Sequence, residues 1–169
     1  RRRRVALLPQ VSDWVPSPAI RRALRESADA LRAAGATVVE WTGAPDTTEG
    51  VLLFFRIMAA TGFASLSQTL SGEAPIDLIQ PNLQLARLPN ALLPVFGRLM
   101  KSRGAGRLSR MLQAASKQSA AGYLDLAGDR LAYEQQMRDA LEAGGFDAIL
   151  LPASPLPAVR HGDTTGLAG

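Results

Sequence analysis

The amino-acid sequence predicts an α/β fold in which a small buried sheet packs against helices. At the start of the chain, a short apolar strand, an amphipathic helix and a second strand follow one another with short connections. Near the end, a third apolar strand follows a long helical segment. Strands that alternate with helices are typical of a parallel sheet. The 169 residues are enough for one domain with a buried core.

The first strand–helix–strand unit is defined by its boundaries. A strand is predicted over residues 4–9, and Ser17 followed by Pro18 predicts a capped helix start, because Pro suits the first helical position. Gly35 is a plausible helix stop, and residues 37–41 form the second strand. Such a unit favours parallel pairing with a right-handed crossover. The buried stripe of the helix is predicted to contain Ile20, Leu24, Ala28 and Leu31.

The middle of the chain is predicted to be helical. One helix is expected over residues 47–70, and residues 106–142 form either one long helix or two abutting ones, ended by Gly144 and Gly145. The third strand is predicted over residues 147–152 and is apolar enough to be buried on both faces, with Asp147 as a turn or strand-start residue. Between these segments we predict a series of short helices, because prolines interrupt longer ones. These prolines are Pro75, Pro81, Pro89 and Pro94.

Composition excludes several chemistries. There is no cysteine, which excludes disulfides and thiolate sites, and the only histidine, His161, has no cluster of metal-ligand spacing around it. We therefore expect neither a metal site nor a Ser-His-Asp relay, because no G-x-S-x-G sequence occurs. The most apolar stretch, residues 51–55, stops at Arg56 and is far shorter than the roughly 20 residues that cross a bilayer.

Positive charge is concentrated in one segment. Residues 78–124 contain no Asp or Glu but seven basic residues. Local basic character is what an acidic partner surface requires. The basic residues are Arg87, Arg98, Lys101, Arg103, Arg107, Arg110 and Lys117.

Three predicted strands are too few to cover both faces and both edges of so apolar a sheet. One interpretation is a small α/β protein with a modest sheet, and the other is a piece of a larger α/β domain. Three stretches favour the second: PSPAIRRA at residues 16–23, LMKSRGAGRL at 99–108, and FDAILLP at 146–152 with PLPA at 155–158 and His161. In this order and spacing they resemble the amidase-signature family, and the middle stretch resembles its fatty acid amide hydrolase branch.

The resemblance implies that residues 1–169 are a single partial domain. They would supply a portion of an α/β/α fold with a mixed central sheet flanked by helices. Residues 75–104 would form a helical, hydrophobic cap that contacts the membrane beside a substrate channel. The family's Ser-Ser-Lys triad would lie upstream of the matched region, so none of the residues here is expected to be catalytic. No metal or organic cofactor is implied.

Specific residues follow from the same resemblance. Met58, Leu93, Phe96 and Met100 match positions that bind the acyl chain, with Met58 standing where the family has a phenylalanine. The segment around them is amphipathic, with apolar residues followed directly by cations, which suits an anionic membrane surface. The residues expected to contact the membrane are Leu92, Leu99, Arg98, Lys101 and Arg103.

The parent protein is thus expected to hydrolyse carboxamides, in particular lipophilic fatty acid amides, to an acid and ammonia or an amine. We expect a cytoplasmic protein with peripheral membrane association and no nucleic-acid partner; a homodimer of the parent enzyme stays open. Two alternatives remain: a non-catalytic membrane-surface binding module, and an amidotransferase-type amidase subunit acting on aminoacyl-tRNA. The apolar segment disfavours the second, because a tRNA-handling enzyme gains nothing from it.

Overall fold

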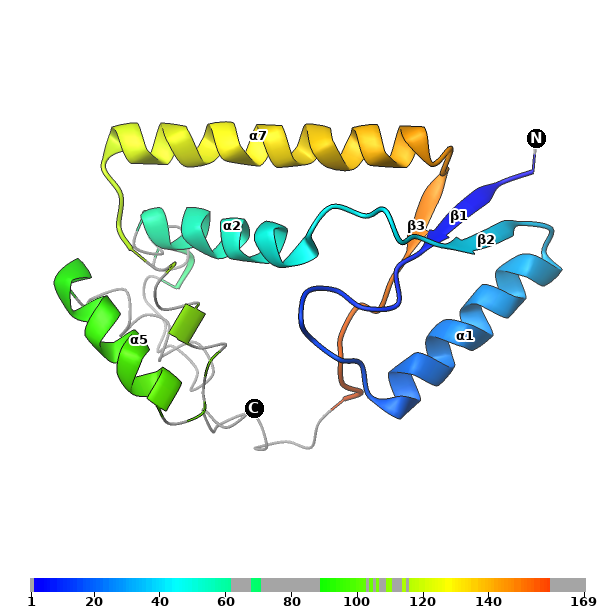
Figure 1. Ribbon diagram of the computed structural model, residues 1–169, viewed down its shortest axis with the longest axis horizontal. Coiled ribbons are helices and arrows are strands. Elements are labelled where there is room, and N and C mark those ends of the chain that lie inside the picture. Colours follow the sequence, from blue (N-terminus) through cyan, green and yellow to red (C-terminus); the bar gives the residue numbers. More distant parts are fainter. Residues whose placement is uncertain are drawn as a thin grey trace. The chain divides into compact units, whose positions relative to one another are not determined.

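The structure is a computed structural model that describes residues 2–61, 68–70, 89–102, 104, 106, 109–110, 114 and 116–158. The chain divides into two compact units, one made of Arg1–Gly50 with Leu131–His161 and the other of Val51–Arg130 with Gly162–Gly169. The first unit contains the sheet, and the second contains most of the helices of the middle of the chain (Figure 1).

The first unit contains a three-stranded parallel sheet. Its strands are β1 (Arg4–Leu7), β2 (Thr37–Glu40) and β3 (Ala148–Leu150), in the spatial order β2-β1-β3. Val5 pairs with Val38 on one side and with Ala148 on the other. The predicted α/β class and the parallel pairing of the first two strands are confirmed. All three described strands are parallel, so the antiparallel strand that a mixed sheet requires is not among them.

Helix α1 (Pro18–Ala33) begins and ends as its sequence predicts. The Ser17 side chain accepts a hydrogen bond from the Ile20 backbone N–H at 3.4 Å, and Pro18 occupies the first turn. At the other end, Gly35 has a φ of +91°, which a residue with a side chain adopts only at a cost. The Ala36 N–H then reaches back to the Leu31 carbonyl at 3.0 Å and closes the helix.

Helix α7 (Ala120–Ala143) ends in the same way, and β3 follows it in the chain. Gly145 has a φ of +61°, and the Phe146 N–H donates to the Leu141 carbonyl at 3.0 Å. After each of these two helix ends, a backbone N–H group donates a hydrogen bond to β1 or to the residue directly before it. The Thr37 N–H donates to the Arg3 carbonyl at 2.8 Å, and the Asp147 N–H donates to the Arg4 carbonyl at 2.7 Å.

The core lies between the sheet and α1. Val5, Val38 and Ala28 are buried together, which confirms the centre of the predicted helix stripe. Leu24 is buried as well, whereas Ile20 and Leu31 at the two ends of the stripe are half-buried. The opposite face of the sheet is covered by contacts of aromatic rings and an arginine. There Trp41 packs against Phe146 with ring centroids 5.7 Å apart, and Arg4 lies over the Phe146 ring.

The second unit departs from the predicted boundaries. Helix α2 (Thr47–Ala60), which begins in the first unit, ends ten residues before the predicted Leu70, at a turn that contains Thr61, a weak helix former. Pro94 lies in the first turn of α5 (Leu93–Ser102), where its missing N–H costs nothing, and it marks the start of a new short helix, as predicted. The short helix η1 (Asn90–Leu92) precedes it.

The segment before α7 favours the interpretation of two helices. Residues 106, 109, 110 and 114 have helical conformation, but residues 116–119 do not, so α7 is separate from them. The predicted cap over residues 75–104 is described only from residue 89 onward, and its first part lies outside the described residues.

Candidate substrate and membrane site

The start of α5 is held by a two-point contact with the segment that precedes α7. The Asn90 side-chain amide donates to the Lys117 carbonyl at 2.8 Å and accepts from the Lys117 N–H at 3.0 Å. The next residue, Gln118, donates from its backbone N–H to the carbonyl of Ala60 at the end of α2, at 3.1 Å. Residues 117 and 118 therefore connect the ends of three helices, and they fix where α5 begins.

Helix α5 has one buried side and one exposed apolar side. Leu93 is only 4 % exposed and Gly97 is buried one turn later. At about 100° per residue, the exposed apolar residues fall within an arc of about 100° beside the buried side. These residues of α5, with their exposed fractions, are Val95 (58 %), Phe96 (41 %) and Leu99 (43 %), and Leu92 (43 %) at the end of η1 is exposed beside them in the sequence.

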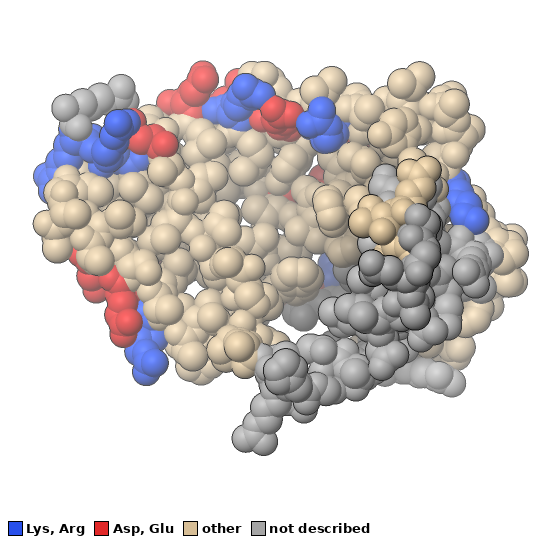
Figure 2. Space-filling view, turned by 180° about the vertical axis from the view of Figure 1, so that it is seen from behind, with Lys and Arg blue, Asp and Glu red and all other residues tan. Residues whose placement is uncertain are grey.

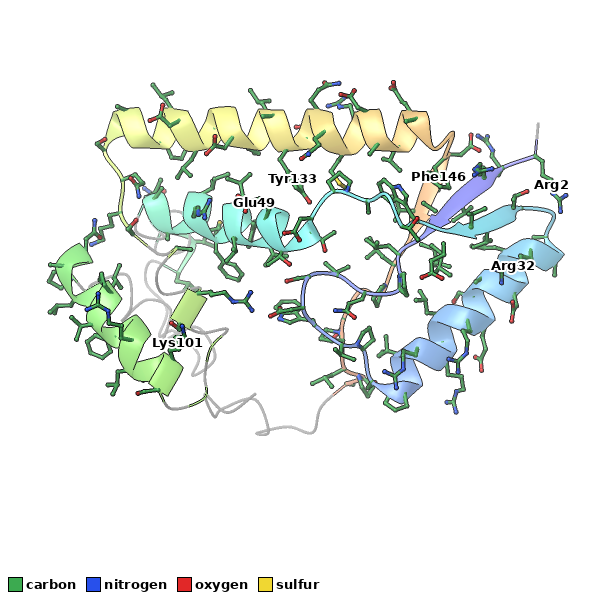
Figure 3. The ribbon with its side chains drawn as sticks, in the orientation of Figure 1. Arg2, Arg32, Glu49, Lys101, Tyr133 and Phe146 are labelled. Atoms are coloured by element: carbon green, nitrogen blue, oxygen red, sulfur yellow. The ribbon has the colours of Figure 1, made fainter. Side chains whose placement is uncertain are left out.

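The cations of α5 occupy a third side of the helix. Arg98 and Lys101 are both exposed and lie away from the exposed apolar arc. Figure 3 labels Lys101 near the end of the helix. Arg103, the third predicted membrane cation, lies outside the described residues. The helix therefore combines exposed apolar and cationic surfaces, which an anionic interface requires.

The structure places three of the four predicted acyl-binding residues on one helix. Leu93 is buried, Met100 is half-buried and Phe96 is exposed, and their spacing puts them along one side of α5. Met58 is half-buried on α2, and in the described part of the chain α2 and α5 share no extensive packing. Near Met58, Phe54 and Phe55 pack edge-to-face with centroids 5.5 Å apart.

Neither lysine of the chain shows the surroundings of a catalytic base. The Ser102 hydroxyl next to Lys101 donates to the Leu99 carbonyl at 2.8 Å, so it completes the helix end rather than facing a base. Lys117 is exposed and is held only through its backbone by Asn90.

A pocket that the sequence does not reveal lies at the carboxyl ends of β1 and β3. It has a volume of about 240 Å³ and mostly apolar walls. The loop after β1 and the loop after β3 form it together, joined by the Ser17 N–H, which donates to the Pro155 carbonyl at 2.8 Å. Ligands of open α/β sheets bind at this end of the strands. The walls consist of Val11, Trp14, Pro16 and residues 151–155.

The pocket wall that contains Val11 and Trp14 includes a strained turn between these two residues. Ser12 has a φ of +56°, which is uncommon for a residue other than glycine. Its N–H donates to the Thr47 hydroxyl at 2.6 Å, and its carbonyl accepts from the Gln10 side chain at 2.9 Å. These bonds hold the turn between Val11 and Trp14. The signal that could have revealed the pocket is the position of Trp14, just after a predicted parallel strand.

The pocket can hold an apolar group but has no described side chain for nucleophilic chemistry. Its one hydroxyl, on Ser154, donates to the Leu156 carbonyl at 2.8 Å and accepts from the Leu156 N–H at 3.3 Å. Both bonds stay within the loop, so this serine shapes the loop. Across the described residues, no three His, Cys, Asp or Glu side chains gather as metal ligands would.

The titration of Tyr133 is shifted by its surroundings. Figure 3 shows Tyr133 pointing from α7 toward the start of α2, and its hydroxyl donates to the Asp46 carbonyl at 3.1 Å. Burial raises the pKa of this hydroxyl, and the nearby charges of Asp46 and Glu49 raise it further. A tyrosine that holds its proton more tightly is a structural donor here and not a general base.

Charged residues on the molecular surface are interspersed rather than gathered by sign along α7. Figure 2 shows acidic and basic side chains alternating along the top of the view, where α7 lies. A mixed surface of this kind is typical of a solvated helix face. None of the helices in the described part of the chain is both long and apolar enough to cross a membrane.

The model of the amidase family matches residues 1–168, so the chain belongs to the amidase family. Among curated proteins, it is 26 % identical over 155 residues to fatty acid amide hydrolase 1 of Caenorhabditis elegans. The predicted resemblance to this family is thereby confirmed.

The match covers the two proteins unequally. It includes 88 % of this chain but only 25 % of the worm protein, so the chain spans about a quarter of that relative's length.

Proposed function

We propose that this chain is part of an enzyme that hydrolyses lipophilic carboxamides, such as fatty acid amides, to the free acid and ammonia or an amine. In this proposal α5 supplies one wall of the acyl-chain site through Leu93, Phe96 and Met100, and Met58 contributes from α2. The catalytic Ser-Ser-Lys triad belongs to a segment outside these residues. The 169 residues by themselves are expected to be inactive.

The observation that carries the proposal is the combination of family membership with the surface of α5. The chain belongs to the amidase family, and a relative named fatty acid amide hydrolase matches most of it. Three side chains on one side of α5 run from a buried leucine to an exposed phenylalanine. A graded apolar surface of this kind can guide a hydrocarbon chain from solvent toward the interior, because each buried methylene stabilises binding by about 0.8 kcal/mol.

The first test compares amides of different chain length. The longest polypeptide that the gene encodes is assayed with a short and a long acyl amide. Phe96→Ala and Met100→Ala should lower kcat/KM for the long substrate by about tenfold or more, which corresponds to about 1.4 kcal/mol, and leave the short substrate nearly unchanged. Val95→Ala is the matched control, because Val95 is exposed on the same helix but is not among the proposed acyl contacts. Equal losses for both substrates would exclude an acyl-binding role.

The second part of the proposal is that the exposed side of α5 contacts an anionic membrane surface. Two separable contributions are expected, one from burial of Leu92, Phe96 and Leu99, and one from Arg98 and Lys101, each cation contributing about 1 kcal/mol near the surface. Leu99→Glu should weaken vesicle binding at every salt concentration. Replacing Arg98 and Lys101 by Gln should weaken it mainly at low salt, because salt screens exposed charges.

The vesicle experiment has a control on the same helix. Leu93 is 4 % exposed, so Leu93→Ala should lower the free energy of unfolding by about 2–5 kcal/mol without removing a membrane contact. Co-sedimentation with neutral and anionic vesicles, together with a thermal melt of each variant, separates the two effects. If Leu99→Glu binds vesicles as the wild type does, α5 is not the membrane surface.

A second candidate function is a non-catalytic membrane-surface binding module. The exposed apolar and cationic sides of α5 support it as well, and they do not require a triad. The same measurements distinguish the two functions. Vesicle binding without any amide turnover by the longest encoded polypeptide would favour the binding module, whereas turnover that depends on chain length favours the enzyme.

A further inference from the structure

The pocket at the carboxyl ends of β1 and β3 lies where the order of the strands reverses. The chain passes from β1 through α1 to β2 on one side of β1, whereas β3 pairs with the other side (Figure 1). In open α/β sheets, ligands bind in the crevice outside the carboxyl ends of the strands at such a reversal. The loops after β1 and β3 form the pocket at this point, so its place in the sheet is that of a ligand site.

The start of α1, which borders the pocket, is not arranged to bind an anion. Ligands at a strand reversal often place a phosphate at a helix N-terminus, where N–H groups lack partners. Here the Ser17 N–H donates to the Pro155 carbonyl at 2.8 Å, and the Ile20 N–H donates to the Ser17 hydroxyl at 3.4 Å. Pro18 between them has no N–H. Three of the four positions 17–20 therefore offer no N–H group to a phosphate or carboxylate.

The walls of the pocket carry no charge. None of the eight described residues that line it is ionisable, and three of them are prolines without an N–H group. The Ser154 hydroxyl is used within its own loop, where it donates to one backbone group of Leu156 and accepts from another. A charged ligand would lose its hydration here without gaining a partner, which is costly. The walls therefore select an uncharged ligand.

The size of the pocket and its tryptophan favour an aromatic ring. Its volume is about 240 Å³. An apolar protein cavity of about 150 Å³ holds one benzene molecule, so there is room for one ring with a short substituent. Trp14 contributes a flat aromatic side chain to the wall. Another ring packs favourably against such a side chain, either offset-stacked or edge-to-face.

The tryptophan wall is held in place by the protein itself. Val11 and Trp14 form a bridge across the turn, and Ser12 between them has a left-handed φ of +56°. The Thr47 hydroxyl fixes this turn by accepting a hydrogen bond from the Ser12 N–H at 2.6 Å. Strained residues of this kind cluster at ligand sites. A preformed pocket binds more tightly, because no loop has to be ordered on binding.

We infer that this pocket is a binding site for a small, uncharged aromatic compound, whose ring packs against Trp14. The ligand consists of one ring with a short neutral substituent, as the volume and the uncharged walls require. The pocket shares no residue with the proposed acyl-chain site on α5 and α2. The inference therefore goes beyond the proposed function and does not depend on amide hydrolysis.

Fluorine NMR of protein labelled with 5-fluorotryptophan tests the site directly. Trp14 and Trp41 are the two tryptophans of the chain, and Trp41, buried against Phe146, is the internal reference. Benzyl alcohol is the probe, added to the 169-residue chain and to the longest polypeptide that the gene encodes. Trp14→Phe assigns the Trp14 signal in each. This signal should shift and saturate in both proteins, while the Trp41 signal stays in place.

Four compounds of related structure define the class of ligand. Benzoate and benzylamine keep the ring but carry a charge, and they should bind about tenfold more weakly than benzyl alcohol. Cyclohexylmethanol and 1-heptanol are uncharged and have as many carbon atoms as benzyl alcohol but no aromatic ring, and they should bind about threefold more weakly. Equal affinity for benzoate would contradict an uncharged ligand. Tighter binding of 1-heptanol would make the pocket a site for alkyl chains.

Three variants locate the bound ring. Ala153 lines the pocket but is exposed, so Ala153→Phe should fill the pocket without unfolding the chain and should abolish the shift of Trp14. Thr47→Val removes the acceptor that fixes Ser12 and should weaken binding about threefold, although Thr47 does not line the pocket. Leu156→Ala is the matched control, because Leu156 is 55 % exposed on the same loop and lies outside the pocket walls. Its affinity should equal that of the wild type.

Each other outcome overturns the inference. An unchanged Trp14 signal in both proteins means that the pocket binds no aromatic ring. A shift in the 169-residue chain that is missing in the longer polypeptide means that the protein itself fills the pocket. Equal shifts of Trp14 and Trp41, or a shift of Trp14 that survives Ala153→Phe, mean that benzyl alcohol binds elsewhere.

Discussion

Asp147 and Arg4 exchange two hydrogen bonds where the third strand joins the first. The Asp147 backbone N–H donates to the Arg4 carbonyl at 2.7 Å, and the Asp147 carboxylate accepts from the Arg4 backbone N–H at 2.7 Å. The carboxylate also lies 3.4 Å from the exposed Arg3 guanidinium. The Asp147 side chain itself is only 16 % exposed. This pairing fixes the register of β3 against β1, although 143 positions separate the two residues.

The first prediction separates the backbone contact of Asp147 from its ion pair. Asp147→Ala leaves the Arg4 N–H without its acceptor and should lower the free energy of unfolding by about 1–3 kcal/mol. Arg3→Ala should cost less than about 0.5 kcal/mol, because Arg3 is 77 % exposed and exposed ion pairs contribute little. Urea denaturation of both variants measures the difference. Equal losses would mean that the ion pair, and not the backbone bond, holds the strand.

The second prediction concerns Gly50 on α2, which packs directly against Tyr133 of α7. A Cβ atom at Gly50 would lie 2.7 Å from the Tyr133 ring, whereas one at Gly128 would meet nothing within 4 Å. Replacing glycine by alanine inside a helix normally stabilises it by about 0.5–1 kcal/mol. Gly128→Ala should therefore raise the melting temperature, and Gly50→Ala should lower it.

A double variant identifies the cause of the loss at Gly50. Tyr133→Ala removes the ring that the new methyl group would contact. In that background Gly50→Ala should again be neutral or stabilising, so the two changes should not be additive. If Gly50→Ala costs the same free energy with and without the Tyr133 ring, the contact with Tyr133 is not the reason.

The parts of the fold that sequence could predict are those governed by local chemistry. Ser17 and Pro18 start α1, and Gly35 and Gly145 end their helices in the left-handed conformation, because each of these effects involves only neighbouring residues. The end of α2 was predicted ten residues too late because the apolar pattern continues through Ala64 and Leu66, past the turn at Thr61. Periodicity carries no information on where a helix stops against its neighbours.

The candidate site was predictable only in part. The amphipathic pattern of α5 indicates which residues share a side, but it does not decide that Leu93 is buried while Leu92 is exposed, since both are apolar neighbours. The pocket around Trp14 needs two loops that are far apart in the sequence, and only the order β2-β1-β3 brings them together. Spacing along one segment contains no such long-range information.

The third prediction tests the contact that fixes the start of α5. Asn90 both donates to and accepts from the backbone of Lys117, so an aspartate in its place keeps the acceptor and loses the donor. Asn90→Asp would also set a carboxylate against the Lys117 carbonyl and should destabilise the chain by about 1–3 kcal/mol. Gln118→Ala is the control with a smaller expected loss, because its backbone bond to Ala60 is retained and only exposed side-chain bonds to Ser116 are removed. Equal urea midpoints for Asn90→Asp and the wild type would contradict the role of this contact.

The last prediction uses the raised pKa of Tyr133 to locate an alkaline loss of stability. Burial first, and then the charges of Asp46 and Glu49, raise the pKa of its hydroxyl above the usual value of about 10. The folded state thus binds this proton more tightly than the unfolded state does. Between the unfolded pKa and the raised folded pKa, the unfolded state holds fewer protons, so the free energy of unfolding decreases as pH rises.

Below about pH 10 the stabilising contribution of the protonated hydroxyl should be complete, and it should be lost as pH rises through the folded pKa. Urea midpoints measured from neutral pH upward should therefore fall more steeply above about pH 10 in the wild type than in Tyr133→Phe. Tyr133→Phe should start from a lower midpoint, because the bond to the Asp46 carbonyl is missing at every pH. Tyr123→Phe, which replaces the other tyrosine of the chain, should keep the wild-type slope. If the wild type and Tyr133→Phe lose stability in parallel, the alkaline transition arises from other groups, and Tyr133 does not couple its proton to folding.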